Sequence, residues 1–285
     1  MFGAKFEKIF KIEPHAKKAK GGELLIYEEV LNKIADQYNP IFSRLKLPES
    51  NGTNKNHSKL LLTHYEGETF NKKWTEETGG LLLGLDLSTE VPEMLYDLSK
   101  IKTSVVLDNK RLQSIPKLIF NTTEFIPEFE SIARRLLDSK ILKKEEIELA
   151  RTSIKKEFTS PLMVNNGDFY PRNFIRQPDK KIILIDWETW NANSRANIVD
   201  HPENIAAFCF VHMWNNEPWQ KNYVTELQKR FSMKEEDFQR ALLIKSIEMA
   251  NFWLDMPGRT ELYKDQIKIF RNALNPEYMR KLWFP

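Results

Sequence analysis

Three oxygen-bearing side chains that could support metal-dependent chemistry lie close together in the second half of the chain. Asp168 ends the turn-forming run 166–168, Asn173 follows after four residues, and Asp186 comes directly after the apolar run 182–185. Carboxylate and amide oxygens are hard ligands of the kind Mg²⁺ prefers, and Mg²⁺ takes one or two of them beside phosphates and water. A carboxylate next to such a metal can also accept a proton from an attacking hydroxyl group.

Each of these residues alone is also an ordinary turn or cap residue, because Asp and Asn are common in turns that carry no chemistry. Asp186 is harder to explain in that way. It lies between the apolar run 182–185 and Trp187, which predicts a partly buried position at the end of a strand. A buried carboxylate needs a cation or hydrogen-bond donors, so a metal site is the favoured interpretation.

A hairpin would bring these residues together. Residues 174–175 and 182–185 read as short apolar strands, and residues 177–180 read as the loop between them. With that loop, residue 173 opposes 184 and residue 171 opposes 186. Since side chains alternate along a strand, Asn173 and Asp186 would be diagonal neighbours on one face, within reach of a common ion.

The preceding part of the chain predicts a mixed region with strands and one helix. Residues 5–12 alternate charged and apolar side chains, as in a strand, and residues 22–36 have apolar residues at helical spacing. The polar run 48–58 predicts a loop, and residues 60–65 predict a second strand. We expect a lobe boundary near residue 67.

The rest of the chain is expected to be mostly helical on either side of the hairpin. Residues 124–139 and 143–158 combine apolar pairs with charged residues. The best-marked helix is expected to begin at Ser232, where residues 232–235 have the pattern of a capping box, and to stop at Pro257.

Composition excludes several classes of protein. The chain has 285 residues, 43 Lys plus Arg and 40 Asp plus Glu, so its net charge of +3 argues against binding nucleic acid through bulk charge. No apolar run is long enough to cross a membrane. The one cysteine, Cys209, rules out an internal disulfide bond, and the sequence is that expected of a cytoplasmic protein.

The run 166–188 resembles the signature of the aminoglycoside phosphotransferase and choline kinase family, which shares the protein-kinase-like fold. That family has His-Gly-Asp, four residues, Asn, and then an apolar strand ending in Ile-Asp-Trp/Phe-Glu. Here residues 166–168, Asn173 and residues 185–188 fall in the same order. The resemblance implies that Asp168 is the catalytic base and that Asn173 and Asp186 are Mg²⁺ ligands.

The resemblance also implies an ATP site in the N-terminal part. The segment 60–65 is similar to the strand leading to the hinge between the family's lobes, so the backbone of Thr63, His64 and Tyr65 would meet the adenine. The segment 8–12 resembles the strand that carries the phosphate-binding lysine.

Two charged residues would complete that ATP site. We prefer Lys11 to Lys8 as the lysine that steadies the α- and β-phosphates. Its partner would be a glutamate of the next helix, and we prefer Glu28 to Glu23 or Glu29.

The acceptor pocket of this family is built by residues after the metal-binding strand. Trp187, Trp190, Trp214 and Trp219 cluster in the matching part of the sequence, and Glu188 could add a charge for a cationic acceptor. Indole rings hold protonated or quaternary amines by cation–π attraction and also stack on sugars. The alternative for each tryptophan is packing in the core.

The expected fold is α+β: a protein-kinase-like two-lobed fold with a reduced N-terminal lobe at 1–67 and a mainly helical C-terminal lobe at 68–285. The sequence departs from the family pattern in three places. Asn166 replaces the usual histidine, and Asn204 replaces the usual acid in a motif at 200–206. Only ten residues precede Lys11, where the family places two strands and a phosphate-covering loop.

These observations predict an ATP- and Mg²⁺-dependent enzyme that phosphorylates a hydroxyl group of a small polar molecule. Amino alcohols, aminoglycosides and sugar-like alcohols remain open as acceptors, and neither nucleic acid nor a membrane is expected as a partner. One alternative is a pseudokinase-like binding module that lacks the glycine-rich loop. Another is a Mg²⁺-dependent phosphohydrolase, which would leave the hinge-like strand unexplained. The sequence does not indicate an oligomeric state.

Overall fold

The structure is a computed structural model that describes residues 8–9, 22–48, 50–53, 60–62, 68–69, 85–110, 112–114, 118–187, 197–212, 217–256 and 260–284. Its contacts divide the chain into two compact units, each made of separate stretches of sequence. Unit 1 comprises Met1–Glu76, Glu93–Ile119 and Met163–Val199, and unit 2 comprises Glu77–Pro92, Phe120–Leu162 and Asp200–Pro285. The boundary expected near residue 67 stays a prediction, because residues 63–67 lie outside the described part.

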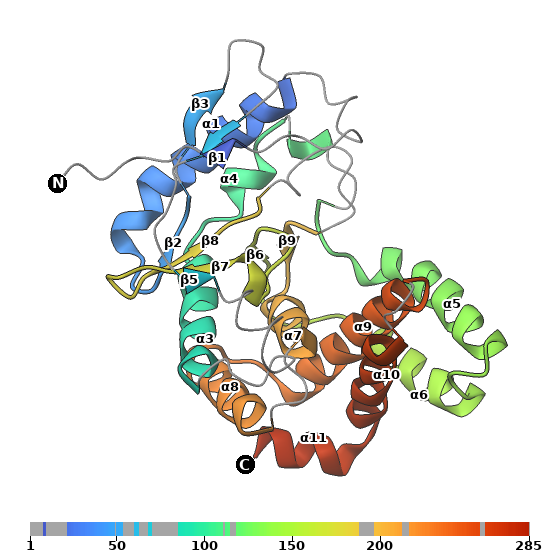
Figure 1. Ribbon diagram of the computed structural model, residues 1–285. Helices are drawn as coiled ribbons and strands as arrows, with labels where there is room; N and C mark the ends of the chain where they lie inside the picture. Colours follow the sequence, from blue (N-terminus) through green and yellow to red (C-terminus); the bar gives the residue numbers. More distant parts are fainter. Residues whose placement is uncertain are drawn as a thin grey trace. The chain divides into compact units, whose positions relative to one another are not determined.

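Unit 1 contains most of the strands. In chain order its elements are β1 (Lys8–Ile9), α1 (Gly22–Tyr38), the 3₁₀ turn η2 (Asn39–Ile41), β2 (Leu45–Lys46), β3 (Ser50–Thr53), β4 (Leu60–Leu62), β5 (Glu68–Thr69), the end of α3 (Leu85–Ser99), α4 (Ser104–Leu107), η3 (Leu112–Ser114), β6 (Met163–Val164), η4 (Pro171–Asn173), β7 (Phe174–Arg176), β8 (Ile182–Leu184) and the start of β9 (Val199–Asp200). The strands β2, β8, β7 and β5 form one sheet in that order, and β1, β4 and β3 form another (Figure 1).

The β1-β4-β3 sheet confirms part of the expected N-terminal region and corrects part of it. β1 pairs antiparallel with β4, with Lys8 opposite Leu62. β3 also pairs antiparallel with β4, although its sequence, Ser-Asn-Gly-Thr, falls in the run predicted to be a loop. This polar run has no apolar alternation that would predict a strand. The strand forms because its backbone pairs with β4.

Helix α1 forms where helical spacing predicted it. Leu31, Ile34 and Tyr38 recur at intervals of three and four residues and are buried. This is the pattern of a helix with one face toward a core.

The hairpin at 174–184 is present, but its register differs by one residue from the predicted one. Phe174 lies opposite Leu184 and Arg176 opposite Ile182. The N–H of Gln177 donates to the carbonyl of Lys181 at 2.8 Å, so the loop contains three residues rather than four. Lys180 ends that loop in the left-handed conformation, with φ of 67°, as in a type I turn closed by a bulge.

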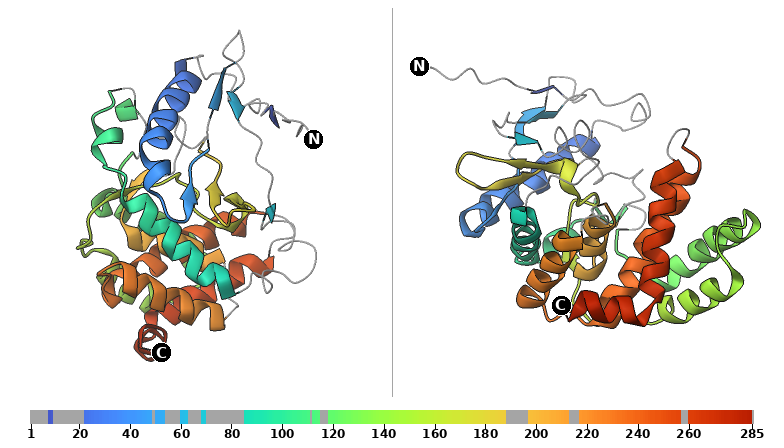
Figure 2. Two further views of the ribbon diagram at one scale, coloured as in Figure 1. Left: turned by 90° about the vertical axis from the view of Figure 1, so that its left-hand side faces the viewer. Right: turned by 60° about the horizontal axis from the view of Figure 1, so that its bottom comes forward.

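Unit 2 is a helical layer. It contains the start of α3, α5 (Thr122–Asp138), α6 (Lys144–Ile154), α7 (Pro202–His212), α8 (Glu217–Arg230), α9 (Glu235–Leu254), α10 (Thr260–Leu274) and α11 (Pro276–Trp283). The long helix α9 packs beside α10, α7, α5 and α6 (Figure 2). Its buried Phe238 meets Phe210 of α7 edge to face, with ring centroids 5.8 Å apart.

The start of α9 corrects one prediction. The helix begins at Glu235 with Lys234 as N-cap, not at Ser232, so residues 232–235 do not form the expected capping box. Among the residues that the structure describes, no helix is long and apolar enough to span a membrane.

Candidate active site

The turn that carries Asp168 is built by its asparagine and glycine neighbours. Gly167 has a positive φ of 78°, a conformation that costs glycine little because it has no Cβ. The side-chain oxygen of Asn165 accepts the N–H of Gly167, and the N–H of Asn165 donates to the carbonyl of Ile198 at 3.0 Å. The turn is thereby fixed to the chain before β9, and Asp168 lies at its end.

Asn173 holds Asp168 from the other side. Its amide nitrogen Nδ2 lies 2.8 Å from the backbone carbonyl oxygen of Asp168 and 2.8 Å from the carboxylate oxygen Oδ2. The short turn η4, which Pro171 begins, brings Asn173 into this position. Because both bonds use the amide nitrogen, the amide oxygen of Asn173 is the atom that can face a cation.

The position of Asp186 is determined by a change of backbone conformation after β8. The strand ends at Leu184, the N–H of Ile185 donates to the carbonyl of Asn173 at 2.9 Å, and Asp186 has a positive φ of 63°. Aspartate is one of the few residues other than glycine that accept this conformation with moderate strain. One carboxylate oxygen of Asp186, Oδ1, is buried.

Asn166 joins the two aspartate segments. Its exposed fraction is 0%, and its Nδ2 lies 3.2 Å from the carbonyl oxygen of Asp168, 3.1 Å from that of Ile185 and 3.3 Å from that of Asp186. Its side-chain oxygen accepts the N–H of Asp168 at 3.2 Å. The residue that departs from the family pattern therefore ties the Asp168 turn to the Asp186 segment. The sequence marked it only as a departure.

The predicted reason for the proximity of Asn173 and Asp186 was wrong. In the observed register residue 173 is opposite 185 and residue 172 opposite 186, so regular alternation would place Asn173 and Asp186 on different faces. Neither residue lies in a regular strand, however. Asn173 ends η4, and Asp186 has left the strand conformation. Turns at the open end of the hairpin, rather than a shared pleat, shape this site.

The donor set fits a hard divalent cation. Asn173 offers an amide oxygen and Asp186 a carboxylate, which is the one or two protein ligands that Mg²⁺ takes when phosphates and water supply the rest. Within the described residues no group of three or more His, Cys, Asp or Glu side chains could hold a metal ion. A closed all-protein metal centre is therefore absent from that part of the chain.

Of the remaining predicted site residues, the structure describes the side chains of two tryptophans, and both are buried. Trp187 is 1% exposed, and its indole N–H donates to the carbonyl of Leu184 at 2.7 Å, so the ring is part of the core. Trp219 is also buried and stacks on Tyr223, with centroids 4.5 Å apart. Glu28 lies in α1, but its side chain is not described. The other predicted residues, outside the described part, are Lys11, Thr63, His64, Tyr65, Glu188, Trp190 and Trp214.

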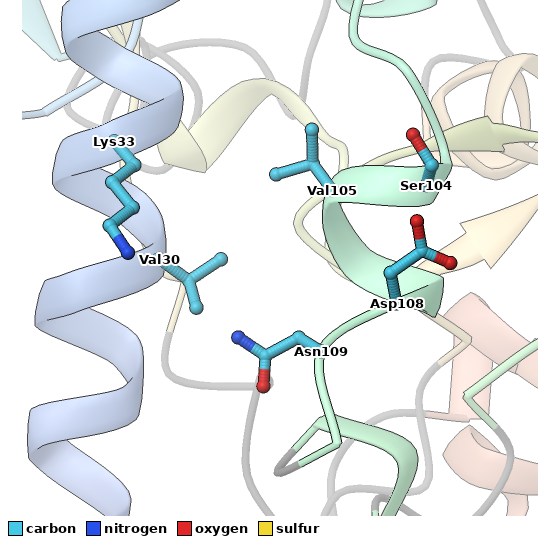
Figure 3. Close-up of a pocket in the computed structure, with 6 residues that line it drawn as sticks. All are labelled: Val30, Lys33, Ser104, Val105, Asp108 and Asn109. Atoms are coloured by element: carbon cyan, nitrogen blue, oxygen red, sulfur yellow. The ribbon is translucent and has the colours of Figure 1, made fainter.

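A separate pocket of about 290 Å³ lies in unit 1 between α1 and the segment that begins with α4. Figure 3 shows Val30 and Lys33 of α1 on one side and Ser104 and Asp108 on the other. None of the predicted site residues lines this pocket.

In unit 2, the motif at 200–206 forms a buried polar group. The carboxylate oxygen Oδ1 of Asp200 accepts the amide of Asn204 at 2.8 Å and the N–H of His201 at 2.7 Å. Burial raises the pKa of Asp200 to about 6, although the ammonium of Lys245 acts in the opposite direction. Asn204 thus supports Asp200 by a hydrogen bond at the position where the family has an acid.

Solved structures share this fold. They include a choline/ethanolamine kinase family protein from Mesorhizobium loti, at 13% identity and a TM-score of 0.55, with 90% of this chain and 82% of that chain covered. A macrolide 2'-phosphotransferase type I gives 13% identity and 0.55, covering 98% and 82%. An ADP-bound aminoglycoside phosphotransferase, APH(2'')-Ib, gives 15% and 0.52, covering 95% and 87%.

These similarities show the fold, an α+β two-lobed fold of kinase-like phosphotransferases, and confirm the expected fold class. The neighbours come from the groups that the hairpin motif resembles. No protein-family model matches the chain, and no curated protein matches it.

Proposed function

We propose that the protein is an ATP- and Mg²⁺-dependent phosphotransferase that acts on a hydroxyl group of a small polar molecule. The observation that carries the proposal is the pair of hydrogen bonds from Asn173 to Asp168, with Asn166 bonding the backbone carbonyls of both Asp168 and Asp186. The fold supports it, because its neighbours include a choline/ethanolamine kinase family protein, a macrolide phosphotransferase and an aminoglycoside phosphotransferase.

In this proposal Asp168 is the base. Its Oδ2 is held by Asn173, which directs the carboxylate toward the acceptor hydroxyl. The acceptor oxygen forms a bond to the γ-phosphorus of ATP, its proton passes to Asp168, and the bond from that phosphorus to the bridging oxygen of ADP breaks.

Asn173 and Asp186 would hold the metal through the amide oxygen and the carboxylate. A bound Mg²⁺ would offset the charge of the phosphates in the transition state. The positive φ of Asp186 and the N–H bond from Ile185 to Asn173 keep the two ligands at the same end of the hairpin. Since ATP is the phosphoryl donor, we place the reaction in the cytoplasm.

A panel of acceptors with a matched pair of variants tests this function. Amino alcohols, aminoglycosides, macrolides and sugars are incubated with MgATP, and ADP formation and ³¹P spectra report transfer. Asp168→Asn should lower turnover by about 10²- to 10⁴-fold, the usual contribution of a general base. The control is Asp179→Asn in the exposed hairpin loop, where the side-chain oxygen keeps its bond to the N–H of Lys181.

Full turnover in Asp168→Asn would contradict the assigned base. MgATP binding without transfer to any acceptor would favour the pseudokinase-like binding module. Phosphate release without a phosphorylated product would favour a phosphohydrolase.

A further inference from the structure

One buried carboxylate of unit 1 gathers an unusual number of donors. Asp97 of α3 is 0% exposed and accepts the consecutive backbone N–H groups of Ser43, Arg44 and Leu45 at 3.1, 2.7 and 2.8 Å. The ammonium of Lys100 adds a bond of 2.6 Å. Successive N–H groups that converge on one anion fix the direction of the backbone that carries them.

The backbone held in this way leads directly into β2. The carbonyl of Arg44 accepts the N–H of Ile182 at 2.8 Å, and Leu45 lies opposite Ile182 in the parallel pairing of β2 with β8. The guanidinium of Arg44 bonds Glu93 of α3 at 2.8 Å and the carbonyl of Lys180 in the hairpin loop at 2.9 Å. Helix α3 is therefore connected to the hairpin through residues 43–46.

Strand β8 carries that connection to the proposed metal site. It lies between β2 and β7 in the sheet (Figure 1), and Asp186 follows its last residue by two positions. A slip of β8 by one residue would turn its side chains to the opposite face. Building on the function proposed above, we propose that Asp97 is a positioning residue that sets the place of Asp186 through β2 and β8.

The charge of Asp97 suits this role. Burial by itself raises the pKa of Asp97, but the N–H groups of Leu45, Arg44 and Ser43 and the Lys100 ammonium outweigh it, so the pKa lies below the ordinary value. The carboxylate is thus ionised at neutral pH and can accept all its donors at once. An amide in its place has one acceptor oxygen and directs an NH₂ group at backbone N–H groups.

The test compares Asp97→Asn with Asp237→Asn. Asp237 is also buried, and it bonds Arg240 at 2.9 Å and Thr159 at 2.6 Å, all within unit 2. Both variants should lose stability. Hydrogen exchange of the Ile182 and Ile185 amides should accelerate at least about tenfold in Asp97→Asn only.

A second readout concerns the metal and uses a fluorescent ATP analogue, mant-ATP. The Mg²⁺ concentration for half-maximal mant-ATP binding should rise about tenfold in Asp97→Asn and stay within about twofold of wild type in Asp237→Asn, as expected for a residue that orients a metal ligand. If Asp97→Asn does not fold, Asp97→Glu takes its place. That change keeps the charge but moves the carboxylate by one methylene group relative to the N–H groups of Ser43, Arg44 and Leu45, and it should accelerate exchange at the same two amides.

The outcomes separate the two proposals. Unchanged exchange at Ile182 and Ile185 in Asp97→Asn, or in Asp97→Glu if the first variant does not fold, overturns the positioning role, whatever nucleotide binding shows. An equal Mg²⁺ requirement in Asp97→Asn and Asp237→Asn overturns it as well. Wild-type protein that binds no mant-ATP with Mg²⁺ overturns the proposed function, and the positioning role with it.

Discussion

The amide nitrogen of Asn173 bonds both the carbonyl and the carboxylate oxygen Oδ2 of Asp168, at 2.8 Å each. One residue thereby holds the proposed base, and in the function proposed above its amide oxygen is also a metal ligand. In this arrangement the base and the metal ligand are mechanically coupled, so a change at Asn173 should affect both proton acceptance and metal binding.

Asn173→Ala should therefore weaken both proton acceptance and metal binding. The variant removes two hydrogen bonds to Asp168 and one oxygen ligand, and we expect turnover to fall by about 10²-fold or more and the Mg²⁺ requirement to rise at least about tenfold. Steady-state kinetics at varied Mg²⁺ concentration measures both. The control is Asn272→Ala on α10, outside unit 1. A fall in turnover with an unchanged Mg²⁺ requirement would contradict the role of Asn173 as a ligand.

Asn166 should contribute to stability as well as to the site. Asn166→Ala removes the amide partner of the partly buried carbonyl groups of Ile185 and Asp186, and one of the partners of the Asp168 carbonyl. Unsatisfied buried acceptors cost about 1–3 kcal/mol, so urea unfolding should show a loss in that range. Asn166→His restores the residue type of the resembled family and should recover part of it. A variant Asn166→Ala as stable as wild type would show that these bonds contribute little.

Much of the site was accessible from the sequence because its parts lie close together along the chain. The turn at 166–168, Asn173 and the end of an apolar strand at Asp186 are local signals. The register was not accessible. Lys180 adopts a left-handed conformation that usually marks glycine, so the three-residue loop could not be distinguished from a loop of four residues.

Features that depend on distant contacts gave no signal. Asp97 and Ser43 are 54 positions apart in sequence, and nothing in the helical pattern of α3 indicates that one of its acidic residues binds backbone groups of another segment. For Trp187 the sequence did give a signal, but the signal fitted two interpretations. The sequence left both an acceptor contact and core packing open for this indole, and its burial and its bond to Leu184 reveal the packing.

The buried Asp200 should produce a measurable pH dependence of stability. Its pKa is raised from 3.8 to about 6, mainly by burial. Between about pH 4 and 6 the folded state binds more protons than the unfolded state, so stability falls as pH rises through this window, by about 3 kcal/mol in total. Asp200→Asn keeps an oxygen that can accept the bond from Asn204, and it should reduce the dependence of stability on pH in this window.

Urea unfolding at several pH values measures the effect. The part of the slope that remains in Asp200→Asn belongs to other groups, including Glu203, whose pKa burial also raises. An identical slope in wild type and variant would contradict the assignment to Asp200.

The proposed metal–nucleotide site depends on Asp186, and calorimetric titration of MgATP into wild type and Asp186→Asn measures that dependence. We predict that wild type binds MgATP and that the variant binds it at least about tenfold more weakly, because a neutral amide replaces the charged ligand. Equal affinity in two folded proteins, or no binding by wild type, would rule out a nucleotide site in which Asp186 holds the metal.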